Sequence, residues 1–198
     1  AGAFAELRKY IMPKDYPDLP VHLMNVYLIE GGPRLLASMS EKSSRKTLEG
    51  LQHLGVKVMC NTVVKEYDGK TLLLSTGETI LTQSLLWSAG VKGVPVTGIP
   101  KEIIIPNGRI LVNEFNQVQG FTNIYAIGDI AQLANDPRFP KGYPMVAQVA
   151  IQQAKNLAEN LIRGWKGQPM QPFRYKDLGS MATIGRNRAV AEFANMIM

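Results

Sequence analysis

The chain has 198 residues, 45% of them hydrophobic, and a formal net charge of +6. This length suits one sizeable domain or two small ones, and no apolar run is long enough to predict a membrane-spanning helix. A single cysteine, Cys60, excludes an internal disulfide framework, a Cys-x-x-Cys redox pair and a cysteine-rich zinc site. His22 and His53 lie far apart without nearby carboxylate patterns, so we expect no metal site.

The first ten residues predict the later part of a helix, because their small side chains allow close packing on a sheet. They lack the basic start and apolar stretch of a signal peptide, and the chain does not begin with Met. We therefore expect a fragment of a longer protein. Pro13, Pro17 and Pro20 are expected to end this helix.

A strand followed by an acidic residue comes next, as in dinucleotide-binding folds. Val21–Ile29 is strand-like, and Glu30 stands at its end. An acid at this position binds the ribose hydroxyls of an adenosine, and its charge repels a 2′-phosphate, which favours NADH over NADPH. The alternative is an exposed strand-end acid of no special role. The glycine-rich loop that usually precedes such a strand is not in this chain.

The following segments continue the pattern of a nicotinamide-binding domain. In order, the sequence predicts a helix from Ser40 to Gly55, a strand over Val56–Met59, a meander that turns at Asp68-Gly69, and a strand over Ser84–Ser88. Ala89 and Gly90 come directly after that strand. Their small size would let a nicotinamide ring pass, but the residues alone favour the simpler explanation of a glycine between strand and loop.

The second half begins with residues 91–107, whose many Gly and Pro residues predict a crossover between domains. Strands are expected over Arg109–Val112 and Ile124–Ile127. Gly128 and Asp129 follow the second of these, and the carboxyl end of a strand is where open α/β sheets bind ligands. Gly128 lets a cofactor approach and Asp129 can bind a polyol hydroxyl, but Gly-Asp pairs are also common in turns.

Pro144 is placed for the first turn of a helix whose apolar periodicity runs to about Gly164. Gln148 and Gln152 share one face of it, and their amides suit a flavin pyrimidine edge or a quinone oxygen. Asn156 and Asn160 extend this stripe, so a solvated helix face is the alternative. Antiparallel strands are expected after the helix. They cover Phe173–Tyr175 and Ser180–Phe193, with a turn at Gly185–Arg188.

Three segments together resemble type II NADH:quinone oxidoreductase. They are the Gly128-Asp129 unit, the helix start Ala147–Gln153, and Gly179–Asn187. Looser similarity comes from Tyr27–Glu30 and Trp87–Val91. The resemblance covers nearly the whole chain, and the order of the three segments is more specific than any one of them.

The resemblance implies an α/β fold with two doubly wound, Rossmann-like dinucleotide-binding domains, both incomplete here. Residues 1–92 would be an NADH-binding domain without its first strand and glycine loop, and residues 93–198 the returning half of an FAD-binding domain. The implied cofactor contacts are Glu30 with the NADH ribose, Ala89 and Gly90 with the nicotinamide, Gly128 and Asp129 with the flavin ribityl chain, and Ala147 and Gln148 with the flavin. Gln148 and Gln152 would line the quinone site.

The implied reaction passes electrons from NADH through FAD to a membrane quinone, without a protein nucleophile or metal. The resemblance implies a peripheral enzyme on the cytoplasmic face of the bacterial inner membrane. A C-terminal segment absent here would dock it on the membrane, and a homodimer is possible. Alternatives are a sulfide:quinone or ferredoxin reductase, and a basic nucleic-acid-binding module. The last rests on residues 138–188, whose nine basic and two acidic residues give +7. A solvated face explains such spaced charges, so we expect no nucleic acid.

Overall fold

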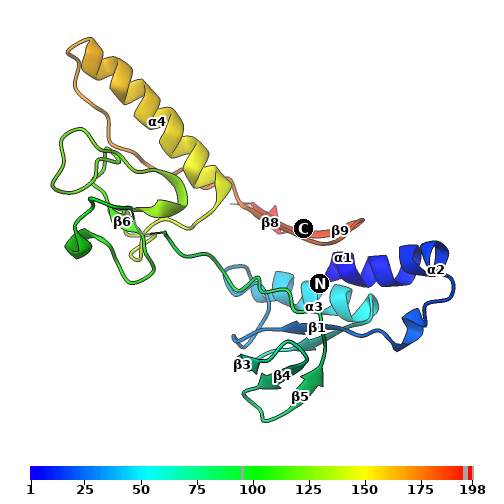
Figure 1. Ribbon diagram of the computed structural model, residues 1–198. Coiled ribbons are helices and arrows are strands. Elements are labelled where there is room, and N and C mark those ends of the chain that lie inside the picture. The colour runs from blue at the N-terminus through cyan, green and yellow to red at the C-terminus, as the bar shows by residue number, and fades with distance from the viewer. Residues whose placement is uncertain (95, 194–195, 198) are drawn as a thin grey trace. The chain divides into compact units, whose positions relative to one another are not determined.

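The computed structural model describes residues 1–94, 96–193 and 196–197, which form two compact units (Figure 1). Unit 1 comprises Ala1–Trp87 and Leu178–Met198, and unit 2 comprises Ser88–Asp177. The predicted boundary near residue 92 lies close to the first junction. The C-terminal residues differ from expectation, because they pack with the N-terminal unit. The assignment of the two domains to NADH and FAD stays a prediction.

Unit 1 opens with three consecutive helical segments. They are α1 (Gly2–Glu6), the π-helix η1 (Leu7–Ile11) and α2 (Met12–Asp15). The expectation that Pro13 ends the helix is wrong, since helical turns continue to Asp15. Pro13 lies in the first turn of α2, where the fixed φ of proline suits a helix.

A strand–helix–strand unit forms the centre of unit 1, as predicted. Strands β1 (Val26–Ile29) and β2 (Val56–Met59) pair in parallel and are joined through α3 (Glu41–His53). Ser40 caps α3 by accepting a hydrogen bond from the Ser43 amide at 3.2 Å. The expected strand was longer than the observed one, because Val21–Leu23 forms the 3₁₀ turn η2 instead.

Three short antiparallel strands follow in sequence order. They are β3 (Val64–Tyr67), β4 (Thr71–Leu74) and β5 (Thr79–Leu81). The predicted turn at Asp68 is confirmed, since its carboxylate accepts hydrogen bonds from the amides of Lys70 and Thr71. The strand expected over Ser84–Ser88 is absent: no neighbouring strand among the described residues pairs with this segment.

The C-terminal hairpin belongs to unit 1. Its strands are β8 (Ser180–Gly185) and β9 (Arg188–Phe193), joined by the predicted turn, with β10 (Met196–Ile197) pairing beyond them. Ile184 and Val190 of the hairpin are buried in the same core as Leu51 of α3. Polar contacts tie the hairpin further: Ser40 donates to the Glu192 carboxylate at 2.5 Å, and Glu6 accepts from the Arg186 amide at 2.9 Å.

Unit 2 contains few regular elements. In chain order they are η3 (Lys101–Ile103), β6 (Ile110–Leu111), the 3₁₀ turn η4 (Gly128–Ile130), β7 (Ala131–Gln132) and α4 (Ala147–Trp165). Strands β6 and β7 pair in parallel. The core holds Ile110, Val112, Val118 and Val149, and the rings of Tyr143, Phe173 and Tyr175 complete it.

Three predictions for unit 2 are wrong in detail. Ile124–Ile127 forms no strand, because only Tyr125 makes an isolated bridge, to Gln117. Phe173–Tyr175 is also irregular: the Phe173 amide donates to the Glu114 carbonyl at 2.7 Å, and the Tyr175 hydroxyl contacts Gln148 of α4. Pro144 precedes the helix, which begins at Ala147.

Among the described residues, no helix combines the length and apolarity that crossing a membrane requires, and no group of metal-binding side chains gathers.

Candidate functional site

The Gly128-Asp129 turn is held against the first turns of α4. Gly128 has φ +71°, a left-handed conformation that favours glycine, and its amide donates to the Gln153 side-chain oxygen at 2.7 Å. A Cβ at Gly128 would lie 3.3 Å from that of Ala150, so little room remains beside the helix. Asp129 follows in η4 and is exposed. The turn thus presents a carboxylate to solvent from a backbone fixed by α4.

The position of this turn in the sheet differs from expectation. Asp129 comes before β7, at its amino end, whereas the sequence predicted a carboxyl end. The backbone of Ile127 is extended, with φ −136° and ψ 163°, but it lacks a strand partner among the described residues. The predicted residues Gly128 and Asp129 are therefore together in one turn, without the strand that was expected to lead into it.

Gln153 is a site residue that the sequence reasoning missed. Its side chain is 1% exposed and supplies the acceptor for the Gly128 amide. It falls next to Gln152 in the chain but faces the core, because adjacent helical residues point about 100° apart. The signal was present, since helical spacing places Gln153 one turn beyond the apolar Val149, on the buried face of α4.

Replacing Gln153 by Leu should destabilise the chain by about 1–3 kcal/mol, because the half-buried Gly128 amide would lose its acceptor. We expect thermal unfolding to begin several degrees lower than in the wild type. Glu159→Gln, at an exposed position of the same helix, is the control and should leave the melting temperature unchanged. Equal melting temperatures for both variants would show that this contact does not hold the turn.

Arg109 is a second residue that the sequence reasoning passed over, since it was assigned only to a strand. Its side chain is 5% exposed, and its guanidinium donates to the carbonyl oxygens of Ala131 and, at 3.1 Å, Tyr143. Burial lowers the pKa of Arg109, and the negative charge of Asp129 partly restores it. The guanidinium thus joins the segment after the Gly-Asp turn to the segment before α4, with Asp129 near its charge.

The amides of the α4 stripe make hydrogen bonds with the backbone of another segment. The Gln152 side chain pairs with the backbone of Lys176 in both directions, at 2.9 and 3.0 Å. Asn160, which is 1% exposed, pairs in the same way with Gln171, at 2.8 Å for both bonds. The stripe therefore imitates a strand edge and holds the extended segment 171–176 along the helix.

Gln148 occupies the start of this stripe. Its side-chain oxygen accepts a hydrogen bond of 3.3 Å from the hydroxyl of Tyr175. Ala147, the first residue of α4, is exposed beside it. The structure thus gathers the predicted residues Gly128, Asp129, Ala147 and Gln148 within unit 2, around the start of one helix.

Glu30 lies where the sequence placed it, directly after β1. Its amide donates to Met59 at the end of β2, and its carboxylate accepts from the Gly32 amide at 2.7 Å. The half-buried side chain therefore stands at the carboxyl edge of the parallel pair, which suits a ribose ligand. Ala89 and Gly90 are exposed in unit 2, and Gly90 has φ +99° with open space where a Cβ would stand.

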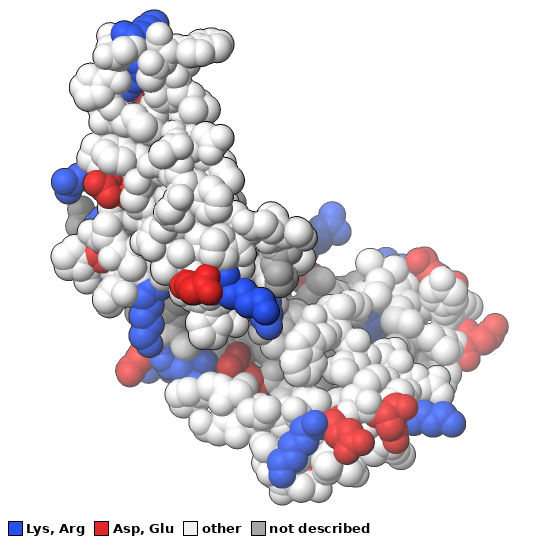
Figure 2. Space-filling view, turned by 60° about the vertical axis from the view of Figure 1, so that its left-hand side comes forward, with Lys and Arg blue, Asp and Glu red and all other residues white. Residues whose placement is uncertain are grey.

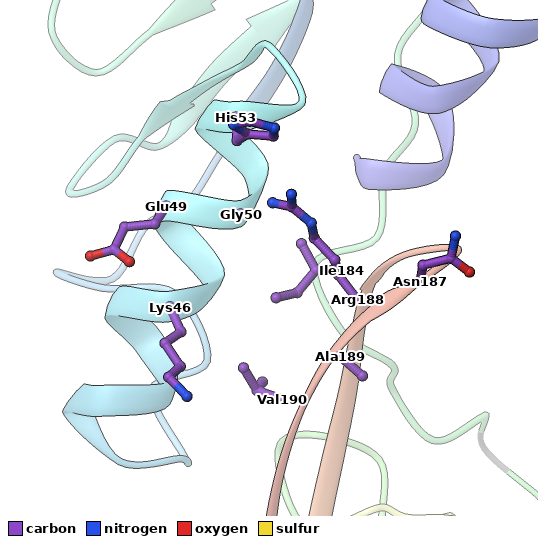
Figure 3. Close-up of a pocket in the computed structure, with 9 residues that line it drawn as sticks. All are labelled: Lys46, Glu49, Gly50, His53, Ile184, Asn187, Arg188, Ala189 and Val190. Atoms are coloured by element: carbon purple, nitrogen blue, oxygen red, sulfur yellow. The ribbon is translucent and has the colours of Figure 1, made fainter. Parts of the chain in front are cut away.

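A shallow groove of about 490 Å³ lies elsewhere, between α3 and the C-terminal hairpin (Figure 3). Arg188 points toward α3 near His53, whereas Glu49 points away from the hairpin. Lys46 adds a third basic group to the rim. All three basic side chains are exposed, and none of the predicted site residues lines this groove.

Comparison with known proteins shows the family. Residues 1–154 match the pyridine nucleotide-disulphide oxidoreductases, so the chain belongs to this family. This confirms the predicted α/β fold with doubly wound dinucleotide-binding domains. The resemblance drawn from the sequence is also confirmed. A type II NADH:quinone oxidoreductase from Haemophilus influenzae is 30% identical over 181 residues, which are 91% of this chain and 40% of the relative.

Solved structures support the fold. NDH2 from Plasmodium falciparum in complex with NADH superimposes with a TM-score of 0.81 at 20% identity, over 98% of this chain and 55% of that one. The sulfide:quinone oxidoreductase from Aquifex aeolicus gives 0.71 at 18% identity, over 97% and 46%. The chain spans about two fifths of the length of the curated relatives it matches.

Proposed function

We propose that this chain is part of an enzyme in which NADH reduces FAD and the reduced flavin passes two electrons to a quinone. The observation that carries the proposal is the site in unit 2, where the Gly128 amide donates to Gln153 of α4 and the exposed Asp129 follows in the same turn. Two relatives that align with the chain over 181 and 203 residues are named type II NADH:quinone oxidoreductases. The term "complete enzyme" below means a protein that contains this chain together with the part of the relatives that the chain does not cover.

FAD would be held in unit 2 by its sugar-alcohol chain. The exposed Asp129 carboxylate can accept hydrogen bonds from the ribityl hydroxyls, while Gly128 offers a backbone without a side chain. Ala147 and Gln148 would stand along the isoalloxazine ring, which itself carries the hydride and electron chemistry. The chain's own contribution is to orient the ring and to place a carboxylate and amides around it.

NADH would bind to unit 1 through the ribose of its adenosine, at Glu30, and the contact of Ala89 and Gly90 with a nicotinamide ring stays a separate prediction for unit 2. Glu30 has one carboxylate oxygen bonded to the Gly32 amide, which orients the group at the end of β1. A carboxylate there accepts both ribose hydroxyls and repels a 2′-phosphate. The open space at Gly90 leaves room for a planar ring beside the backbone.

The quinone would meet the amides of Gln148 and Gln152. An amide nitrogen carries two N–H donors, and Gln152 uses one for the Lys176 carbonyl. The second can therefore donate to a quinone oxygen while segment 171–176 stays in place. This adds to the sequence-based hypothesis, which did not include the backbone of Lys176 as a partner of Gln152.

Gln152→Ala in the complete enzyme should slow quinone reduction about tenfold and change flavin reduction by NADH less than twofold, because only the second half-reaction uses the amide. Stopped-flow absorbance of the flavin measures both half-reactions separately. Asn156→Ala, one turn further along the same stripe, is the matched control, since it removes a similar amide contact to segment 171–176. Equal slowing in both variants would assign Gln152 to packing alone.

Substrate tests distinguish this proposal from its rivals. The complete enzyme should reduce a soluble quinone with NADH as donor and should not use sulfide. A sulfide-driven reaction without NADH would favour the sulfide:quinone oxidoreductase alternative.

The second rival is a nucleic-acid-binding module. On the face drawn in Figure 2, basic and acidic side chains are interspersed. Salt-sensitive binding to DNA without any effect of NADH on the protein would instead favour a nucleic-acid-binding module.

Location and assembly are part of the same proposal. A membrane quinone is lipid-soluble, so the complete enzyme must reach the bilayer surface. We place it as a peripheral protein on the cytoplasmic face of the bacterial inner membrane, with a homodimer as a candidate state. Co-sedimentation with phospholipid vesicles and light scattering in solution measure these two properties.

A further inference from the structure

Arg34 holds the loop that connects the end of β1 to the start of α3. Its guanidinium donates to the carbonyl oxygens of Leu36 at 3.2 Å, Ala37 at 2.8 Å and Met39 at 2.9 Å. The planar fork of donors on an arginine can reach several acceptors at once. Residues 31–39 contain no helix or strand, so these bonds to Arg34 are a main determinant of the loop's shape.

The middle of this loop has a strained backbone. Leu36 has φ +49°, in the left-handed region, which is unfavourable for a residue with a side chain. Its carbonyl oxygen accepts from the Met39 amide at 2.8 Å as well as from Arg34. Leu35 and Met39 are buried in the core of unit 1 and anchor the loop on either side of the strained residue. Strained turns persist only where their surroundings hold them, and they cluster at ligand sites.

Glu30, the proposed ribose-binding acid, stands directly before the same loop. Its carboxylate accepts from the Gly32 amide at 2.7 Å, two residues before Arg34. The Gly32 carbonyl in turn accepts from the Asn61 amide at 2.8 Å, just after β2. A ribose bound to Glu30 would therefore lie beside this loop, at the carboxyl edge of β1 and β2. A change in the loop would move the Gly32 amide and, with it, the carboxylate.

The guanidinium of Arg34 is engaged by the protein itself. In dinucleotide-binding folds, an arginine near the ribose-binding position can accommodate a 2′-phosphate. Here the carbonyl oxygens of the loop take its donors. Hydrogen bonds from Ser40 and Ser43 lower the pKa of Glu192, and the positive charge of Arg34 lowers it further, so a carboxylate also lies near this cation. Arg34 is thus placed to shape the loop and not to bind a phosphate.

We propose that Arg34 is a positioning residue for the adenosine half of NADH, which keeps loop 31–39 in the shape that presents Glu30 to the ribose. The inference rests on the function proposed above, since it takes NADH as the ligand, and it adds a residue that does not touch the cofactor. Arg34→Met keeps an apolar stem and removes every donor. The three carbonyl oxygens would then lose their common partner, and the turn at Leu36 could relax.

The experiment compares Arg34→Met with Arg45→Met in the complete, flavin-loaded enzyme. Arg45 is exposed on α3, so its replacement removes the same charge from unit 1. We expect Arg34→Met to raise the KM for NADH and the calorimetric Kd for ADP-ribose about tenfold, because the carboxylate is no longer held toward the ribose. Its kcat, flavin content and quinone KM should equal those of the wild type. Arg45→Met should match the wild type in every measurement.

Two further variants make the test specific. Arg34→Lys keeps the charge, but one ammonium group cannot reach three carbonyl oxygens as the guanidinium does, so ADP-ribose affinity should fall between those of the wild type and Arg34→Met. Arg34→Lys also replaces Arg34→Met in every comparison if the methionine variant does not retain flavin. If Arg34 acts through Glu30, adding Arg34→Met to Glu30→Ala should have no further effect on the Kd for ADP-ribose.

Three results would overturn the inference. They are an equal rise in the KM for NADH and for the quinone, a full effect of Arg34→Met on top of Glu30→Ala, and a greater loss for NADPH than for NADH. The last result would assign the guanidinium to the 2′-phosphate. Calorimetry with ADP-ribose needs no quinone, so an enzyme that binds ADP-ribose but reduces no quinone would overturn the proposed function alone.

Discussion

Asp129→Ala in the complete enzyme is expected to weaken FAD binding about 10- to 100-fold. A carboxylate that accepts hydrogen bonds from a ligand typically contributes about 1.5–3 kcal/mol, and alanine leaves the ribityl hydroxyls without that partner. Much of the purified variant should therefore be colourless. The flavin-to-protein absorbance ratio, followed by titration of the apoprotein with FAD, measures the loss.

Asp129→Asn is the control for charge, because it keeps one side-chain oxygen as an acceptor. We expect FAD affinity between those of the wild type and the alanine variant. The buried guanidinium of Arg109 loses its neighbouring negative charge in both variants, so the melting temperature of each apoprotein must be recorded beside the affinity. A wild-type FAD affinity in the alanine variant would remove Asp129 from the flavin site.

The second large effect concerns the choice of nicotinamide. The complete enzyme should prefer NADH to NADPH by about 100-fold in kcat/KM, because Glu30 would bind the ribose hydroxyls and repel a 2′-phosphate. Glu30→Gln should reduce the ratio of kcat/KM for NADH to kcat/KM for NADPH about tenfold. We expect a lower kcat/KM for NADH and a higher one for NADPH. Steady-state kinetics with both cofactors measure the ratio.

Glutamine is the informative replacement because its side-chain oxygen can still accept from the Gly32 amide, as the carboxylate does at 2.7 Å. The turn after β1 should therefore fold as before, and the change in charge is tested alone. Glu66→Gln, on strand β3, serves as a control for the loss of one negative charge. Equal catalytic efficiency of the wild type with the two cofactors would refute the role assigned to Glu30.

Local features were predicted well because their causes are local. Ser40 was expected to begin a helix and caps α3, and the turns at Asp68-Gly69 and Gly185–Arg188 were placed correctly. In each case a side chain or backbone within a few residues satisfies the bond that defines the element. The parallel pairing of β1 with β2 also followed from the strand–helix–strand order.

Strand predictions failed where pairing partners were required. Ser84–Ser88 and Ile124–Ile127 have suitable compositions, but a strand exists only when another backbone pairs with it, and within the described residues none does so fully. The hairpin Ser180–Phe193 was recognised as a local unit. The hairpin packs on α3 of unit 1 and does not belong to unit 2. This packing depends on contacts between residues more than a hundred positions apart in the sequence, such as Ser40 and Glu192.

The sequence by itself determined which groups carry the proposed chemistry: Glu30 after a strand, the Gly128-Asp129 turn, and amides at helical spacing on α4. Only the tertiary structure decided what those amides bind and which further residues support them. Gln152 and Asn160 hold segment 171–176, Gln153 holds the Gly128 amide, and the Tyr175 hydroxyl contacts Gln148. Helical spacing gives the direction of a side chain, whereas its partner depends on the distant segments that folding brings to that face.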